Sequence, residues 1–452
     1  MEDSSLSLLP PIITILIAMW RKNALMALLS GVVLCFIMAA NWQPITGVVN
    51  SFHSIVNVFL SIQNVYIISF SMIIGAFVAL MNHCGAVNGF IAHLAKLNLV
   101  KNSRHAGMLP TVIGSSIFTD SNLSMFTAGM ASQTLFDKHN FSRARLAYLL
   151  DSTCAPISIL ILINGWGAYV LGLLNGYNLA DPVAVLMGTI VYNFYAIIAV
   201  MLAYYTAYTG KIYGPMKHSL TRSYNGDDQE IIKQAPARVM WIPLVSLLVI
   251  ALTLLLVTGN GDMRRGNGAF SVFWSVIGSL TILILFIGHY RLMSFNTIIT
   301  VAYNGIKKML PVLGILVLSF SFGEAIKTLG TGIYISQLIN VSLPLFLIAP
   351  AIFLIAALTA FTTGTSWATF AILIPIAVPV AMASALPVPF LVAAVLGGGI
   401  FGDHASPISD TTVVASIASG CDHFEHVKTQ LPYALVGGIA SLILYTLIGL
   451  TF

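Results

Sequence analysis

The sequence predicts an all-α polytopic membrane protein. Of its 452 residues, 58% are hydrophobic and 8% are charged, whereas a soluble domain carries about 25% charged residues. Its mean hydropathy is +0.92. The apolar residues form long runs rather than the short alternating segments of an outer-membrane barrel. These observations exclude a soluble enzyme, a disordered protein and a nucleic-acid binder, so the net charge of +5 is assigned to loops at the membrane surface.

About ten apolar runs are long enough to predict membrane crossings. They lie at 7–20, 24–40, 62–82, 146–163, 183–208, 239–257, 268–289, 309–326, 389–401 with 404–420, and 430–451. Two further stretches, 106–136 and 344–383, are apolar but interrupted by Gly, Pro, Ser and Thr. Each predicts a re-entrant hairpin of two half-helices, since irregular backbone at membrane depth must be buried in protein or line a wet cavity. Segments 86–97 and 331–342 are left open between interfacial and membrane-crossing positions.

The two halves of the chain resemble each other in three places, always in the same order. The pairs are 71–85 with the stretch that ends in 321–330, 118–122 with 362–366, and 151–158 with 402–409. We therefore predict a first membrane repeat at 1–208, a cytoplasmic linker at 209–238 and a second membrane repeat at 239–452. With five crossings in each half, the second repeat enters the membrane from the opposite side, which is the inverted-topology plan of secondary transporters.

Basic residues predict the orientation, because cytoplasmic loops are enriched in Lys and Arg. Arg21 and Lys22 follow the first apolar run, and the linker carries five more basic residues. Placing both termini outside puts 17 of the 20 basic residues on the cytoplasmic side. The N-terminus shows no basic region or cleavage site of a signal peptide, so the first run is expected to stay in the membrane.

Five of the 15 acidic residues lie inside apolar segments. An ionised side chain at mid-membrane costs about 2.5–3.5 kcal/mol, and only Lys327 is near in sequence as a basic partner. The acids must therefore be protonated, face water or bind a mobile cation. The last option gives them a function, whereas hydrogen bonding between helices by protonated acids is the structural alternative. The five are Asp120, Asp151, Glu324, Asp403 and Asp410.

The densest polar site is the stretch 401–412, Phe-Gly-Asp-His-Ala-Ser-Pro-Ile-Ser-Asp-Thr-Thr. Asp403 and Asp410 are seven residues apart, so an unbroken helix would place them on one face. Pro407 lies between them and lacks a backbone donor, which favours a broken helix with free carbonyls. Carboxylates, hydroxyls and carbonyls together suit a hard cation such as Na⁺. The candidate ligands here are Asp403, His404, Ser406, Ser409, Asp410 and Thr411.

His404 has two interpretations. It could ligate a metal or relay protons, or it could be a hydrogen-bonded core residue, because no second histidine stands at helical spacing. In the first half, Asp151 precedes Pro156 and occupies nearly the symmetry-related place. We therefore predict a second broken helix there, and Na⁺ ligands at Asp151, Asp403 and Asp410. The remaining candidates come from this segment and from the hairpin tips: Ser152, Thr153, Asp120, Asn122, Thr363, Thr365 and Ser366.

Three of these stretches closely resemble the NhaC-type sodium/proton antiporters: 402–412, 364–371 and 142–156. The resemblance extends over nearly the whole chain. It implies a cation/proton antiporter of the wider ion-transporter superfamily in the bacterial plasma (inner) membrane. The family's first hairpin carries paired aspartates followed by Asn, whereas this chain has Asp120-Ser121 and Ser124. One carboxylate is thus missing, and close relatives exchange organic acids, so the substrate is less determined than the fold.

The sequence therefore predicts secondary active transport by alternating access, with Na⁺ and H⁺ as cargo and no cofactor. It has no GxxxxGK[ST] nucleotide motif, which leaves an ion gradient as the energy source. A sodium- or proton-coupled carrier of organic or amino acids is the alternative, and an intramembrane metal hydrolase built on Asp403, His404 and Asp410 is a distant third. The expected partners are the lipid bilayer and small cations, with organic anions and a homodimer left open and nucleic acid excluded.

Overall fold

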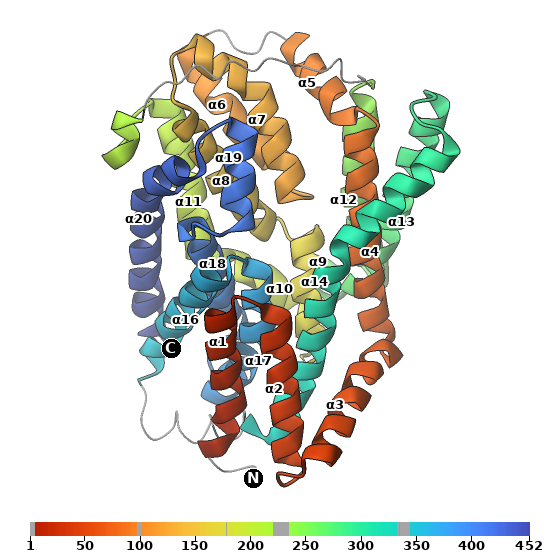
Figure 1. The fold of residues 1–452 in the computed structure, drawn as a ribbon, viewed down its shortest axis with the longest axis vertical. Helices are drawn as coiled ribbons and strands as arrows, with labels where there is room; N and C mark the ends of the chain where they lie inside the picture. The colour runs from red at the N-terminus through yellow and green to blue at the C-terminus, as the bar shows by residue number, and fades with distance from the viewer. Residues whose placement is uncertain (1–4, 97–101, 178, 220–234, 332–333, 335–343) are drawn as a thin grey trace.

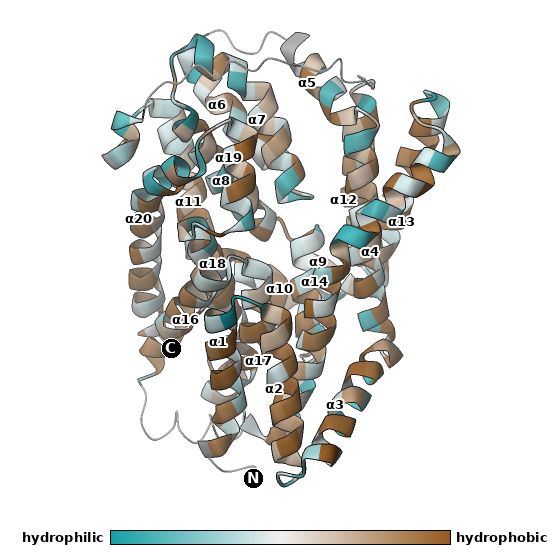
Figure 2. Cartoon of the chain, viewed as in Figure 1, coloured by the Kyte–Doolittle hydropathy of each residue, from teal (hydrophilic) through white to brown (hydrophobic). Residues whose placement is uncertain are grey.

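The computed structural model describes residues 5–96, 102–177, 179–219, 235–331, 334 and 344–452, and in these ranges every regular element is a helix. Figure 1 shows the helices packed into one elongated bundle, with both termini in the lower half of the view. Apolar residues cover most of the helices, and hydrophilic residues gather at the upper end (Figure 2). The all-α membrane architecture predicted from the sequence is therefore confirmed.

Eight helices in the described part of the chain are long and apolar enough to cross a membrane, and two bent pairs raise the number to ten if each pair is one span. Five of the eight are α4 (Ile62–His83), α12 (Arg238–Thr258), α13 (Gly268–His289), α14 (Phe295–Leu329) and α20 (His423–Gly449). The other three are α16 (Ile348–Thr363), α17 (Ser366–Ser384) and α18 (Val388–Ala405). In α16, the qualifying span starts at Leu345.

The first two predicted crossings are wrong as separate spans. Helices α1 (Leu9–Arg21) and α2 (Ala24–Ala39) have 13 and 16 residues, fewer than the ~20 that a span needs. They lie side by side in the lower half of Figure 1, joined by a tight turn at Lys22. The predicted runs, 7–20 and 24–40, match these helices closely, so the error was to count such short runs as full crossings. The next helix, α3 (Pro44–Asn57), is a short apolar helix that the sequence did not predict.

Both predicted hairpins are pairs of helices joined by short turns. In the first, α6 (Ser103–Ser116) is followed by α7 (Ser121–Lys138), and in the second α16 is followed by α17. The pairs lie at opposite ends of the molecule, with α6 and α7 in the upper part and α16 and α17 in the lower part (Figure 1). Their connecting turns are therefore placed to approach the middle of the molecule from opposite directions.

Three further elements are bent or broken. Helices α8 (Arg143–Leu160) and α9 (Gly165–Asn175) meet at 42°, and α10 (Pro182–Tyr192) and α11 (Phe194–Thr209) at 48°. Helix α18 is separated from α19 (Asp410–Ser419) by four non-helical residues. The break predicted around Asp151–Pro156 is wrong in position, because α8 continues past Pro156 and ends four residues later. A proline removes only one donor, and burial on all sides keeps this helix intact.

The segments left open by the sequence are resolved in part. Residues 86–96 form the short helix α5 (Ala86–Lys96). Most of 331–342, and residues 220–234 of the predicted linker, lie outside the described residues. The proposed repeat boundaries and inverted topology therefore stay predictions.

Two glycines allow a close contact between helices in the core. A Cβ atom built on Gly398 would lie 2.3 Å from the Phe353 carbonyl oxygen, and one on Gly402 would lie 2.1 Å from that of Ala357. Both distances are far below van der Waals contact, so α18 and α16 approach backbone to backbone. The spacing of the two glycines is the small-xxx-small pattern of membrane helix pairs. This contact fixes α18, which carries the densest polar motif, against the second hairpin.

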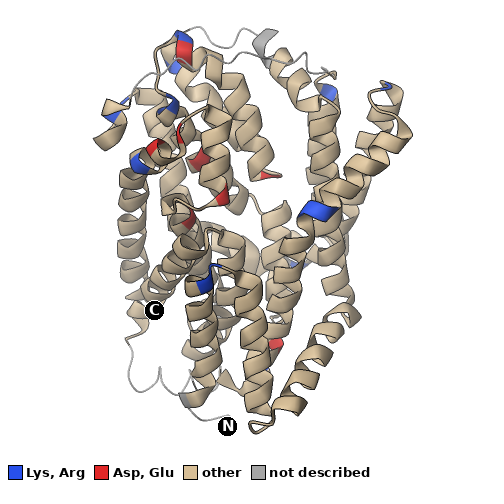
Figure 3. Cartoon of the chain, in the orientation of Figure 1, with Lys and Arg blue, Asp and Glu red and all other residues tan. Residues whose placement is uncertain are grey.

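The orientation of the chain can be tested by cysteine labelling. Most Lys and Arg residues lie at the upper end in Figure 3, which we expect to be cytoplasmic. Because α1 and α2 do not count as crossings, Arg21 and Lys22 no longer support the predicted orientation. The number of crossings before the linker falls by two, so the predicted sides of the linker and the C-terminus do not change. Exposed Thr451 should therefore be outside and exposed Lys211 inside.

The measurement is labelling of Thr451→Cys and Lys211→Cys with a membrane-impermeant maleimide in intact cells. The background is low because Cys35, Cys84 and Cys154 are buried, and Cys421 can be replaced by Ala. We expect Thr451→Cys to label in intact cells and Lys211→Cys only after permeabilisation. Equal labelling of both in intact cells would contradict this orientation.

Candidate functional site

The interruption between α18 and α19 is held open by hydrogen bonds from its own hydroxyls. Ser406 Oγ donates to the Phe361 carbonyl of α16 at 2.7 Å, and Thr412 Oγ1 donates to the Ser406 carbonyl at 3.1 Å. Pro407 within it has no N–H to continue a helix. The predicted broken helix is confirmed here. Asp403 ends up in the last turn of α18 and Asp410 at the first position of α19, so the two do not share the face of one helix.

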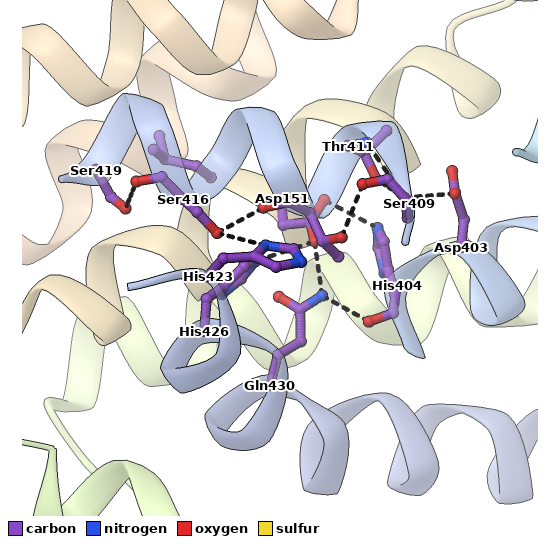
Figure 4. A network of polar contacts seen from close by, with 12 residues as sticks. Asp151, Asp403, His404, Ser409, Thr411, Ser416, Ser419, His423, His426 and Gln430 are labelled. Atoms are coloured by element: carbon purple, nitrogen blue, oxygen red, sulfur yellow. Dashed lines mark hydrogen bonds and ion pairs between the residues drawn. The ribbon is translucent and has the colours of Figure 1, made fainter. Parts of the chain in front are cut away.

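Asp403 is 1% exposed, and each of its carboxylate oxygens accepts a hydrogen bond from a serine. Ser366 Oγ donates to Oδ2 at 2.5 Å, and Ser409 Oγ donates to Oδ1 at 2.6 Å (Figure 4 shows the Ser409 contact). Ser366 begins α17, the second arm of the hairpin. In the described part of the chain, no Lys or Arg pairs with Asp403. A buried carboxyl is thus held between the hairpin and the helix break by neutral donors only.

Asp410 differs from Asp403 because its side chain is exposed. As the first residue of α19 it lies at the positive end of the helix dipole, which favours a negative charge. Thr411 follows it, and the Thr411 hydroxyl lies 3.1 Å from Ser409 Oγ. Asp403, Ser366, Ser409 and Thr411 therefore form one hydrogen-bonded cluster around a buried carboxyl, and the exposed carboxyl of Asp410 stands between Ser409 and Thr411 in the chain.

Asp151 on α8 is fully buried and lies in a second, adjoining cluster (Figure 4). Its Oδ2 accepts a hydrogen bond from Gln430 Nε2 at 2.7 Å and lies 3.3 Å from His426 Nε2. Its Oδ1 lies 3.8 Å from His404 Nε2. On the other side of the imidazole, Nδ1 of His404 contacts the Tyr195 hydroxyl at 3.1 Å. This carboxyl is therefore surrounded by imidazole and amide groups from the second half of the chain.

Sequence reasoning missed His426, Gln430 and Tyr195. His426 and Gln430 stand four residues apart and so face the same side of α20. Both are buried. Their spacing at the start of an apolar helix was the available signal, since buried polar side chains need partners. Tyr195 carried no comparable signal, because tyrosines at membrane helix ends are common as interface anchors.

At the first hairpin tip, Asp120 serves as the N-cap of α7. Its Oδ1 accepts a hydrogen bond from the Leu123 N–H at 2.7 Å, so this carboxyl is held by the first turn of α7. Asn122 Oδ1 is buried without a hydrogen-bond partner in the described part of the chain. Asn164, at the α8–α9 bend, donates to the Phe118 carbonyl at 2.8 Å. The tip is thus tied to the bend by a residue that the sequence analysis did not select.

The second hairpin tip turns at Gly364, whose φ of +70° is in the left-handed region. A Cβ atom there would lie 2.5 Å from the Ile408 carbonyl oxygen, so the tip packs directly on the α18–α19 interruption. Thr363 Oγ1 donates a hydrogen bond to the Thr359 carbonyl oxygen at 2.8 Å, and Thr153 Oγ1 donates one to the Leu149 carbonyl oxygen at 2.6 Å. These two predicted hydroxyls are therefore occupied by their own helices.

The remaining predicted residues fall into simple positions. Thr365 is the N-cap residue of α17, but its side chain makes no capping hydrogen bond. Ser152 is buried next to Asp151 on α8. Repulsion between the acids links the sites: Asp410 feels the negative charges of Asp151 and Asp120, and Asp403 feels those of Asp410 and Asp151. Asp403 and Asp410, each near Asp151 and without a basic partner in the described part of the chain, favour binding of a cation.

Comparison with known proteins identifies the family. A sequence profile of the Na⁺/H⁺ antiporter family matches residues 157–450, about two thirds of the chain. The chain belongs to this family. An uncharacterised protein of Haemophilus influenzae is 28% identical over 480 aligned positions, which span the whole chain and 92% of that relative. The predicted resemblance to sodium/proton antiporters is confirmed.

Two further antiporters match part of the chain. The malate-2H⁺/Na⁺-lactate antiporter of Bacillus subtilis is 32% identical over 35% of this chain and 34% of its own length. The arginine/ornithine antiporter ArcD of Halobacterium salinarum is 37% identical over 23% of this chain and 22% of its own length. The two relatives are therefore named for different substrates.

Two solved structures share the fold. They are the Alcanivorax borkumensis YdaH transporter, with a TM-score of 0.61 at 14% identity over 90% of both chains, and Neisseria gonorrhoeae MtrF, with 0.63 at 12% over 94% of both. The described helices and the family together make the chain a multi-pass membrane transporter of the bacterial plasma membrane.

Proposed function

We propose that this antiporter family member exchanges Na⁺ for H⁺ at Asp403 and Asp410 by alternating access. The observation that carries the proposal is the environment of Asp403: full burial, one serine hydroxyl on each carboxylate oxygen and no basic partner in the described chain. A charge at this depth without a partner costs several kcal/mol. Binding either a proton or a cation removes that cost, so the site must hold one of the two.

The chemistry of the donors suits Na⁺ as cargo. Two carboxyls and the hydroxyls of Ser366, Ser409 and Thr411 form an all-oxygen set, which hard cations prefer. The carbonyls of Ser406, Pro407 and Ser409, which the sequence predicts to be free, instead accept hydrogen bonds from Thr412 and His423. Protons compete for the same carboxyls. Exchange then follows without any covalent step, because the site releases one ion to take the other.

The position of the site suits alternating access. Asp403 joins α18 to the hairpin through Ser366, and Ser406 joins the break to α16. Broken helices and hairpins that meet at a central site are the common arrangement of secondary transporters. Asp151 has a different part in this proposal: its imidazole and amide neighbours hold it beside the cation, where its charge adds to the attraction.

A sodium-coupled exchanger of organic or amino acids is the second candidate. It is favoured by the two relatives named for malate with lactate and for arginine with ornithine. Purified protein in liposomes with an internal pH dye separates the candidates. Na⁺ alone should drive proton movement in an antiporter. A signal that requires malate, lactate, arginine or ornithine would support the exchanger and overturn the proposal.

If Na⁺ and protons share the carboxyls, apparent Na⁺ affinity must fall as pH falls. Protonation removes the charge that the cation needs, by up to about tenfold per pH unit for each proton displaced. Maximal turnover should change less, because saturating Na⁺ still displaces the proton. The titratable groups that face Asp403 and Asp410 are Asp120, Asp151 and, through Asp151, the imidazoles of His404 and His426.

The measurement is apparent Na⁺ affinity at several pH values in liposomes with defined gradients. A flat affinity between about pH 6 and pH 9, a range in which a shifted carboxyl or imidazole titrates, would contradict a shared site. Li⁺ and K⁺ run in parallel give the cation selectivity.

A further inference from the structure

A second polar cavity lies away from the ion site. It has a volume of about 320 Å³ and forms where the last turns of α14 meet the α3–α4 connection, the end of α9 and α17. None of the residues proposed as Na⁺ ligands lines it. Its volume is at the lower end of the range for small-molecule sites. The cavity is therefore large enough for a small ligand and independent of the exchange mechanism.

Two opposite charges line this cavity without neutralising each other. Glu324 and Lys327 are three residues apart and thus lie on one face of α14. Both side chains are exposed, and no ion pair joins them. Instead, Ser54 Oγ donates to Glu324 Oε2 at 3.1 Å and lies 2.9 Å from Ser321 Oγ. The carboxylate is positioned by a serine, so both charges stay available to a ligand.

An unpaired hydroxyl points to the same ligand region. The Tyr177 hydroxyl is buried and has no hydrogen-bond partner in the described part of the chain. It lies beside Gly323, where a Cβ atom would come within 3.1 Å of it. Buried hydroxyls are normally bonded, so a ligand polar group would satisfy this one. The wall also has an apolar part, formed by Val58, Leu173, Phe320 and Pro375.

We propose that this cavity binds a small apolar α-amino acid. The ammonium group pairs with Glu324, the carboxylate pairs with Lys327 and accepts a hydrogen bond from the Tyr177 hydroxyl, and the side chain packs on the apolar wall. Na⁺ alone is disfavoured by Lys327, and a dicarboxylate is disfavoured by Glu324. An apolar amino acid is a small ligand that pairs with both charges and also packs against the apolar wall.

Another cavity, between α4 and α14 at their other ends, provides a comparison. It has a volume of about 760 Å³ and is lined by Ala79, Asn82, His83 and Lys308, among others, and no acidic residue of the described chain lines it. In the alignment of the two halves, Ala79 stands where Glu324 stands. That cavity has a lysine without a carboxylate, so it should not recognise a zwitterion. Lys308 is therefore a matched control for Lys327.

The test is calorimetric titration of the purified full-length protein in detergent with L-leucine, L-methionine and L-phenylalanine. We expect at least one of them to bind. The two leucine analogues that lack one charge, 4-methylpentanoate and 3-methylbutylamine, should bind at least about tenfold more weakly, the size of a lost charged hydrogen bond. No binding by any of the three amino acids, or equal binding by an analogue, would overturn the proposal.

Substitutions locate the site. Glu324→Gln and Lys327→Gln should each weaken amino-acid binding by about tenfold or more, whereas Lys308→Gln should leave it unchanged. Glu324→Gln keeps an acceptor for Ser54, so the helix contact survives, and a melting curve checks this. Unchanged binding in both Glu324→Gln and Lys327→Gln would place the ligand elsewhere and overturn the assignment. Na⁺ exchange measured on the same preparations reports on the proposed function separately.

Discussion

Asp403→Asn is expected to abolish Na⁺-driven proton exchange while the protein still folds. The amide keeps an oxygen for one serine and has the same shape, but it cannot carry the charge that a cation needs. Removing a buried charge from a cation site costs about 3 kcal/mol or more, roughly 100-fold in affinity. Asp410→Asn should act in the same direction, and Asp151→Asn comparably, because its charge acts on both.

The measurement is the initial rate of Na⁺-dependent pH change in liposomes, with melting temperature as the check on folding. Asp422→Asn is the matched control: Asp422 caps α20 by accepting from the Glu425 N–H at 3.0 Å, and Asn caps a helix as well as Asp does. It should exchange like the wild type. Wild-type exchange by Asp403→Asn would remove this residue from the site.

Gly402→Ala is expected to lower the melting temperature substantially. The new Cβ would lie 2.1 Å from a backbone carbonyl oxygen of α16, and a backbone atom cannot move aside as a flexible side chain can. The two helices must separate, which typically costs about 1–3 kcal/mol of stability. Gly398→Ala should behave similarly, because its Cβ meets the Phe353 carbonyl oxygen.

Thermal unfolding in detergent, followed by near-ultraviolet circular dichroism, measures the loss. Gly288→Ala in α13 is the control, since a Cβ atom there meets nothing within 4 Å and alanine favours a helix. It should be neutral or slightly stabilising. If Gly402→Ala melted like the control, the close approach of α16 and α18 would be wrong.

Local chemistry made some elements predictable from the sequence. The interruption at 406–409 was marked by a proline among hydroxyls, and the two hairpins by polar residues inside apolar stretches. The lengths of α1 and α2 were also predictable, but their place beside each other as two short helices was not. An apolar run shows that a segment can lie in the membrane. Whether the segment crosses the membrane depends on the helices that pack around it.

The carboxyls of the site were predictable from the sequence, but most of their hydrogen-bond partners were not. Carboxyls in apolar runs identified Asp151, Asp403 and Asp410, because an ionised group there requires an explanation. Their neighbours depended on tertiary packing: His426 and Gln430 reach Asp151 from more than 270 positions away in the chain. The bend at Asn164 was missed for a related reason, since an asparagine at a helix start is ordinary until its contact with the hairpin tip is known.

The two contacts at the hairpins have a mechanical consequence. Asn164 joins the first tip to the α8–α9 bend, and Ser406 joins the second hairpin to the α18–α19 break. With the two halves divided as the sequence predicts, each hairpin is bonded to the interrupted helix of its own half, and we infer that it moves together with that helix. Motion that exposes the site would then shear one half against the other. The bonds that shear would stretch are those crossing between halves, with Gln430 to Asp151 at 2.7 Å at their centre.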